Sequence, residues 1–161
     1  MSLPPSHTSL REFFVERGLI GPDEPIVEKE LRSAFGVHQA LHGKVEARSG
    51  PAPTAPELAV IDQAAREARL ELHFGSEEGP RIEATATGLS GALGRILAAA
   101  FLAELDGSWK RLKECSDETC TGVFYDRSKN HSGKWCSMRS CGNRNKVRAW
   151  RARQRTGGPA A

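Results

Sequence analysis

Four cysteines near the C-terminus constrain the fold of this chain more than any other sequence feature. They form two pairs, Cys115-x4-Cys120 and Cys136-x4-Cys141, with fifteen residues between the pairs. Zinc favours a closed tetrahedron of four thiolates, and short-spaced pairs supply these ligands at a small cost in loop-closure entropy. The spacing therefore predicts one structural zinc ion per chain, bound by all four cysteines. Because four cysteines close the coordination shell, we do not expect a catalytic zinc.

Two disulfides, or four unrelated buried thiols, are the alternatives to zinc. The sequence begins without the pattern of a secretory leader, and its longest apolar run, residues 96–103, is too short to cross a bilayer. We therefore expect a cytoplasmic protein without membrane contact. Structural disulfides are disfavoured in that reducing compartment, which favours metal binding. His131 lies between the pairs and is a candidate to replace one ligand, although a solvated loop histidine is the simpler interpretation.

The two ends of the chain carry opposite charge. Residues 1–106 contain 10 Lys or Arg and 16 Asp or Glu, whereas residues 107–161 contain 13 and 4. The second part has no acidic residue after Asp126. This asymmetry predicts an acidic N-terminal domain and a C-terminal region that binds a polyanion, of which nucleic acid is the commonest.

Helical periodicity predicts that residues 1–106 form one mostly helical domain. Capping-box patterns at Ser9 and Thr54, each with a glutamate three residues later, mark two helix starts. Gly18 is expected to end the first helix, and Gly43 the second. The side chains expected to face the core are Leu10, Phe13 and Phe14 in the first helix, Val27, Leu31, Ala34, Phe35, His38 and Leu41 in the second, Leu58, Ile61, Ala65 and Ala68 in the third, and Leu93, Ile96, Leu97, Ala100, Phe101 and Leu105 in a helix over residues 90–105.

Two short alternating segments, residues 70–74 and 81–85, flank the turn sequence GSEEGP and predict a β-hairpin. The proline-rich stretch at residues 49–56 cannot continue a helix and should be an exposed connection. A chain of 161 residues has room for one core and a small metal-held module. The expected fold class is α+β, with a mostly helical N-terminal domain at residues 1–106, a zinc finger at residues 107–156 and a disordered tail at residues 157–161.

The segments around the cysteine pairs predict how the zinc finger is built. Residues 109–112 should form a strand that enters the first pair, and residues 123–125 a strand that leaves it. The second pair precedes a helical pattern that runs from Asn143 to Gln154 without a breaker. A hairpin around one ligand pair, with the other pair at the start of a helix, resembles a treble clef.

The C-terminal helix carries a stripe of arginines at spacings of four, three and four residues: Arg144, Arg148, Arg151 and Arg155. Lys146 and Arg153 flank this stripe, so all six cations are candidate nucleic-acid contacts. Guanidinium groups bind phosphate bidentately, and an α-helix fits the major groove, which favours duplex DNA. A solvated helix, docking of the stripe on the acidic domain, and RNA recognition by shape are the alternatives. Arg144 could instead hydrogen-bond a carbonyl group within the finger.

The uncharged residues of this helix have predicted structural roles. Val147 and Trp150 are three residues apart and should pack on the zinc hairpin near residues 124–125. Gly142 and Asn143 lie where the last cysteine meets the helix. Backbone clearance is the expected role of the glycine, and capping that of the asparagine.

The segment WCSMRSCGNRNKVRAWRAR at residues 135–153 resembles the signature of the CGNR zinc-finger family, with the tetrapeptide itself at residues 141–144. The first cysteine pair, the FYDRSKN stretch at residues 124–130 and the helical domain are also similar to that family, whose N-terminal part is called the ABATE domain. Members usually begin with an apolar segment, and only MSLPPSHTS precedes Leu10, which implies that the first element is missing. The resemblance implies a bacterial transcriptional regulator with a zinc-stabilised DNA-binding end.

Other motifs give no basis for an enzyme. His38 and His42 are four residues apart but lack an HExxH pattern or a third ligand, and GLSGALGR at residues 88–95 does not match a dinucleotide fingerprint. We therefore expect a DNA-binding regulator without catalytic activity. The alternatives are an adaptor that binds an acidic protein or RNA, and a redox sensor in which neighbouring cations activate Cys136. A small-molecule effector in the N-terminal domain and homodimerisation are open extensions.

Overall fold

The computed structural model describes residues 7–47, 51–75 and 79–156. The chain divides between Lys110 and Arg111 into two compact units, which we call the body and the finger. The predicted tail at residues 157–161 lies outside the described residues, as do residues 49–50 of the proline-rich connection and residues 76–78 of the hairpin turn.

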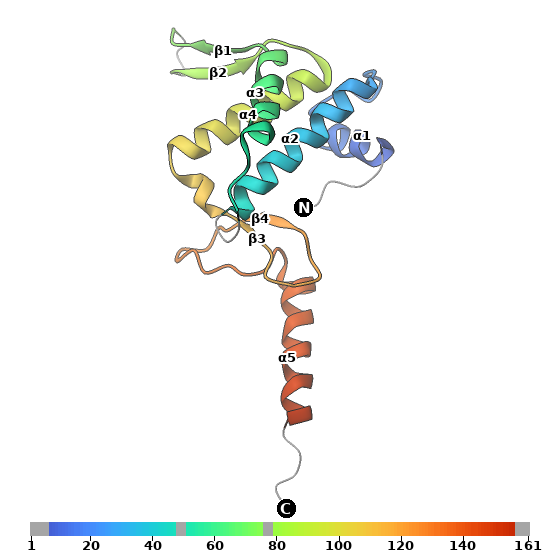
Figure 1. Ribbon diagram of the computed structural model, residues 1–161, viewed down its shortest axis with the longest axis vertical. Helices are drawn as coiled ribbons and strands as arrows, with labels where there is room; N and C mark the ends of the chain where they lie inside the picture. Colours follow the sequence, from blue (N-terminus) through green and yellow to red (C-terminus); the bar gives the residue numbers. More distant parts are fainter. Residues whose placement is uncertain (1–6, 48–50, 76–78, 157–161) are drawn as a thin grey trace, which may run out of the picture. The chain divides into compact units, whose positions relative to one another are not determined.

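The described part of the body is mostly helical and contains one antiparallel hairpin (Figure 1). In chain order its elements are α1 (His7–Glu16), α2 (Glu28–Glu46), α3 (Ala55–Glu67), β1 (Leu70–His73), β2 (Arg81–Ala84) and α4 (Gly88–Leu105). In the hairpin, Leu70 is opposite Ala84 and His73 is opposite Arg81. The predicted fold class is confirmed, including the hairpin and its position in the chain.

The end of α1 follows the prediction, but its start does not. The amide of Gly18 donates to the Val15 carbonyl, and that of Leu19 to the Phe14 carbonyl. With Gly18 at φ 61°, these bonds form a Schellman motif, which confirms the glycine stop. The helix begins at His7, however, so the predicted cap Ser9 is wrong and lies inside the first turn.

Two features of α2 and α3 depart from the expected pattern. Helix α2 continues through Gly43 to Glu46, because Val45 in the next turn is buried and holds the helix in the core. Helix α3 begins after Thr54 as predicted, with the Glu57 carboxylate accepting bonds from the Thr54 amide and hydroxyl. Leu58 is exposed, whereas Ala64 is buried, so the inward face of α3 is rotated from the predicted stripe.

Helix α4 is the centre of the body's core. It packs against α2, α3 and β2, and its buried side chains are Leu89, Ala92, Leu93, Leu97 and Ala98. Gly94 permits this approach, since a Cβ placed there would lie 2.6 Å from the Cβ atoms of both Ala68 and Ala84. The core is completed by side chains of the neighbouring elements, among them Phe14, Leu31, Val37 and Ala64.

The last two turns of α4 do not follow the predicted stripe. Phe101 is 55% exposed and Leu105 is 70% exposed, whereas the buried residues of the helix lie between Leu89 and Ala98. Among the described residues, α4 is also the one helix long and apolar enough to cross a membrane by composition. A core helix passes the same test, and the burial of Leu89 and Leu97 shows that α4 is one.

The finger contains two short strands and two helical segments. They are β3 (Leu112–Glu114), β4 (Val123–Tyr125), η2 (Met138–Gly142) and α5 (Asn143–Thr156). The strands are antiparallel, with Leu112 opposite Tyr125. Residues 109–112 were expected to form the entering strand, but the 3₁₀ turn η1 (Ser108–Arg111) takes most of that segment. The hairpin around the first cysteine pair and the helix after the second pair are confirmed.

Candidate metal centre and basic helix

The four cysteine sulfurs form one cluster. Cys136 Sγ lies 3.8 Å from Cys120 Sγ and 3.6 Å from Cys141 Sγ, and all four Sγ atoms lie within 4.8 Å of one another. A zinc ion bound tetrahedrally at 2.3 Å places its sulfurs about 3.8 Å apart. These separations fit four ligands of one zinc ion and are far longer than the roughly 2.05 Å of a disulfide. The predicted zinc site is therefore confirmed by the separations of its four cysteines. All four cysteines are free, which does not support the disulfide alternative.

The charges of the thiols also favour a cation at the centre of the cluster. Burial and three neighbouring thiols raise the pKa of Cys136 to about 12, and burial likewise raises the pKa of Cys141. The pKa of Cys115 is lowered: burial opposes this, but the amides of Cys136 and Asp117 and the neighbouring thiols outweigh it. Zinc supplies the positive charge that allows all four to ionise.

The first two ligands are positioned by the loop at residues 115–122, which joins β3 and β4. The Cys115 amide donates to the Gly122 carbonyl at 2.9 Å, and the Cys120 amide donates to the Asp117 carbonyl at 2.8 Å. The Gly122 amide also donates to Cys120 Sγ at 3.4 Å. These bonds close a tight turn that directs the sulfurs of Cys115 and Cys120 into the cysteine cluster.

The other two ligands are positioned by η2, a single π-helical turn that runs directly into α5. A Cβ on Gly142 would lie 3.2 Å from Trp135 Cδ1 and 2.8 Å from Met138 Sδ, so the glycine gives clearance to two side chains and not to the backbone as predicted. Asn143 is already helical, and its side-chain amide donates to the Arg139 carbonyl at 3.3 Å. It therefore caps the end of η2 instead of the start of α5.

Histidines take no part in the cysteine cluster. His131 is exposed, in a turn with φ 51°, and the sulfur cluster consists of cysteines alone. In the body, the ring centroids of His38 and His42 lie 5.8 Å apart, and His42 Nδ1 lies 3.0 Å from Glu46 Oε1. Burial and the neighbouring His42 lower the pKa of His38.

A buried carboxylate, Asp126, organises the loop between the cysteine pairs. It accepts hydrogen bonds from Lys113 Nζ at 2.6 Å and from the amides of Gly133 and Ser128 at 2.9 and 3.0 Å. Arg111 donates to two carbonyls of the same loop. The hydrogen bonds from Lys113 and Ser128 hold the pKa of Asp126 well below its usual range. Polar contacts therefore fix the part of the finger that has little apolar core.

A second buried carboxylate, Asp117, connects the first cysteine loop to α5. Its Oδ1 accepts hydrogen bonds from the Thr119 hydroxyl and amide, at 2.7 and 3.0 Å. Arg144 lies 3.4 Å from Oδ2 and also donates to the Thr119 hydroxyl at 2.7 Å, while Arg148 lies 3.7 Å from Oδ1. The bonds from Thr119, followed by the two guanidinium groups, lower the pKa of Asp117. This Asp117 clamp sets the rotation of α5 about its axis.

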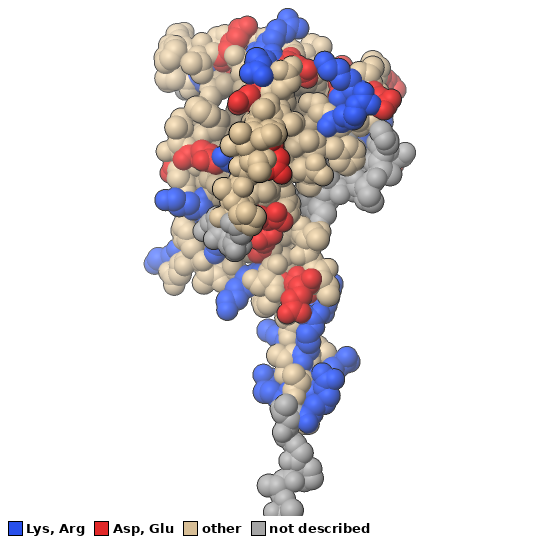
Figure 2. Space-filling model, viewed as in Figure 1, with Lys and Arg blue, Asp and Glu red and all other residues tan. Residues whose placement is uncertain are grey.

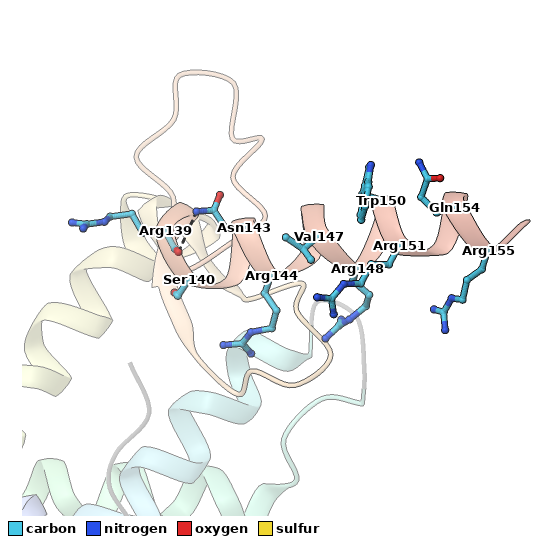
Figure 3. A pocket seen from close by; sticks show the side chains of 10 residues that line it. All are labelled: Arg139, Ser140, Asn143, Arg144, Val147, Arg148, Trp150, Arg151, Gln154 and Arg155. Carbon is cyan, nitrogen blue, oxygen red and sulfur yellow. Dashed lines mark hydrogen bonds between the residues drawn. The ribbon is translucent and has the colours of Figure 1, made fainter. Parts of the chain in front are cut away.

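The cations of α5 lie on an exposed helix. Arg151, Arg153, Arg155 and Lys146 are all exposed, and Figure 2 shows Lys and Arg on both sides of the helix with uncharged atoms between them. The predicted packing of the two apolar residues is wrong, because Val147 is 47% exposed and Trp150 is 55% exposed. Both belong to the outer surface of α5, in an open hollow lined mainly by arginines (Figure 3).

Sequence reasoning missed the two buried carboxylates. The stretch from residue 111 to the end of α5 has only four acidic residues, and both carboxylates are among them. Their positions in the sequence are the signal that could have identified them. Asp117 lies between two ligand cysteines, and Asp126 lies in a strongly basic segment. Within the finger, Arg144 contacts the side chains of Thr119 and Asp117 in place of the carbonyl that was predicted, and its contact with phosphate stays a prediction.

Comparison with known families identifies the finger. Residues 111–154 match the model of the CGNR zinc finger, a span that includes all four cysteines and nearly all of α5. The predicted resemblance is thereby confirmed for this part of the chain. The ABATE-like character of the body stays a prediction. No curated protein matches the chain.

Proposed function

We propose that the CGNR zinc finger at residues 111–154 binds duplex DNA through α5 and that the protein regulates transcription without catalytic activity. The exposed cations of α5 carry this proposal: the helix has no acidic residue, and its six Lys and Arg extend over its whole length. Regularly spaced phosphates are the polyanion that such a helix fits best.

Zinc has a structural role in this proposal. Cys115, Cys120, Cys136 and Cys141 would hold the ion, which supplies the charge that binds four thiolates together. The finger has too few buried apolar side chains to fold without such a connection. Zinc and the Asp117 clamp together fix where α5 leaves the cysteine cluster. The phosphate contacts are then made by a helix whose position is already determined.

The alternatives predicted from the sequence would use the same helix differently. An adaptor for an acidic protein would bind any polyanion of suitable charge, without preference for a duplex. RNA recognition would favour single strands or A-form helices. A redox sensor would react through the Cys136 thiolate and would lose zinc on oxidation.

Salt dependence of DNA binding tests the proposal. Binding of a labelled 20-base-pair duplex would be measured by fluorescence anisotropy between about 50 and 200 mM salt. If four cations contact phosphates, the slope of log affinity against log salt should be about −3.6, and removal of one should reduce it by about 0.9. Arg151→Gln should show that reduction, whereas Arg32→Gln, an exposed body arginine paired with Glu28, should not.

Two controls separate DNA binding from the alternatives. Cys136→Ser should lose both zinc and DNA binding, because the finger no longer holds α5 in place. Polyglutamate and single-stranded RNA should compete weakly with the duplex. Equal competition by polyglutamate, or a slope near zero, would remove the DNA model and support the adaptor.

A further inference from the structure

Three of the strips that run lengthwise along α5 form one continuous face, and a fourth strip on the opposite side contains Asn145, Ala149 and Ala152. At 3.6 residues per turn, four uncharged side chains at spacings of four, three and four share one strip: Asn143, Val147, Trp150 and Gln154. One neighbouring strip contains Arg144, Arg148, Arg151 and Arg155. The strip on the other side contains Lys146 and Arg153. The uncharged strip thus lies between two rows of cations.

The uncharged strip and the row of arginines beside it can be followed in the structure. In Figure 3, Asn143, Trp150 and Gln154 point to one side of α5, while Arg144, Arg148 and Arg155 point to the other. Figure 2 shows cations on both sides of the same helix. All four uncharged residues are exposed and line the same open hollow.

The uncharged strip has the chemistry that reads base edges. Gln and Asn pair bidentately with adenine, and apolar side chains contact the methyl group of thymine. Gln154 is exposed, and its amide can serve as both donor and acceptor. Asn143 donates to the Arg139 carbonyl, which leaves its side-chain oxygen as an acceptor for a base amino group. Val147 and Trp150 supply the apolar contacts.

The flanking cations decide between a duplex and a protein partner. A helix in the major groove has a phosphate backbone on each side, so cations are needed on both flanks of the reading strip. A strip that packed against another copy of α5 would bring two rows of arginines together at its edges, which is electrostatically unfavourable. The charge pattern therefore fits duplex DNA better than a second basic helix.

We infer that α5 is a recognition helix that reads base edges in the major groove through Asn143, Val147, Trp150 and Gln154, with A·T pairs at the positions that Val147 and Gln154 contact. This inference rests on the proposed DNA binding and adds sequence specificity to it. The Asp117 clamp acts as a positioning element, because it holds Arg144 and Arg148, which form one flank of the uncharged strip.

Selection from randomised duplexes tests this inference. The zinc-loaded full-length protein would be mixed with duplexes that carry ten random central base pairs, and bound and unbound fractions would be sequenced. The wild type should enrich a short A·T-containing site at least tenfold over the pool. Gln154→Ala should remove the preference for adenine at one position of that site, and Val147→Ala the preference for thymine at another. Ala149→Gln, on the opposite exposed face of α5, is the matched control and should leave the preferred site unchanged.

The affinity for random duplex separates specificity from general binding. Gln154→Ala and Val147→Ala change no charge, so their affinity for a random duplex should stay within about twofold and their salt slope should not change. If the wild type binds duplex with the predicted salt slope but enriches no sequence, the inference is wrong and the proposed function stands. If the wild type does not bind duplex at all, both fail.

One further outcome would assign the strip to another partner. Sedimentation analysis should show that Val147→Ala and the wild type have the same oligomeric state. If the wild type forms a dimer that Val147→Ala dissociates, and Ala149→Gln does not, the strip is a contact between protein helices. That result would overturn the assignment to base reading.

Discussion

The body and the finger are stabilised in opposite ways. The body buries a continuous group of apolar side chains around α4, and its surface ion pairs, such as Lys29 with Glu67, are exposed at one partner or both. In the described part of the finger, the buried residues are two cysteines, two glycines and two carboxylates, Asp117 and Asp126. Apolar burial therefore stabilises the body, whereas metal ligation and buried polar contacts stabilise the finger.

This difference shows what each unit requires of its sequence. A core of packed side chains tolerates changes that conserve volume, because many contacts share the free energy. A metal-held unit depends on a few atoms, since each ligand or buried carboxylate has no substitute of the same geometry. We therefore expect the two units to respond independently to changes that remove metal, apolar volume or charge.

Metal removal should produce the largest difference between the units. A chelator such as EDTA should unfold the finger, because structural zinc contributes about 10–16 kcal/mol in comparable small modules. The body has its own core and should stay folded. Amide hydrogen exchange would measure this, with protection lost in residues 112–125 and kept in α2 and α4. Loss of protection in both units would show that the body depends on the finger.

Truncation of the body's core should have the next largest effect. Leu89 is fully buried at the centre of the core, so Leu89→Ala should lower the free energy of unfolding of the body by about 3 kcal/mol. Denaturant unfolding followed by far-UV circular dichroism would measure the loss. Zinc content per chain should not change, and Leu72→Ala, at an exposed position of the hairpin, serves as the control. A zinc content reduced by Leu89→Ala would contradict the independence of the units.

The smallest effect should come from the Asp126 carboxylate. Its pKa is lowered in the folded finger, so its ionised form contributes stability above the unfolded-state pKa near about 4, and this contribution is lost as the pH falls below that value. Asp126→Asn should therefore destabilise the finger at pH 7, and its difference from the wild type in the free energy of unfolding should stay constant down to about pH 4 and narrow only below it. Urea unfolding of the zinc-loaded wild type and of Asp126→Asn would be followed by tryptophan fluorescence at several pH values. The difference between their urea midpoints measures the contribution of the carboxylate. A difference independent of pH would mean that the carboxylate charge does not act in the folded state.

Local sequence patterns predicted much of this structure. The cysteine spacing identified the zinc ligands, Gly18 and Thr54 correctly marked a helix end and a helix start, and the alternation after residue 70 identified the hairpin. Each of these features depends on residues that are close in sequence, or on ligands whose spacing has few geometric solutions.

Features set by tertiary contacts were harder to predict. Apolar periodicity shows that a helix has an inward face, but it does not show which turns are covered, and so the exposed end of α4 was missed. Gly94 faces two alanines whose positions depend on the whole body. The burial of Asp117 and Asp126 was missed because a carboxylate is normally exposed, and its partners Arg144 and Lys113 lie far along the chain.

The exposure of α5 also has a consequence for its order. A helix of 14 residues is marginally stable alone, and within one charge strip Arg144 and Arg148, like Arg151 and Arg155, are four residues apart and repel each other. The Asp117 clamp relieves this repulsion in the first turns only. The outer turns of α5 should therefore exchange their amide hydrogens faster than the turn beside the zinc ligands. Anions that neutralise Arg151 and Arg155 should slow this exchange, so that the ionic composition of the solution controls how much of the helix is formed before any partner binds.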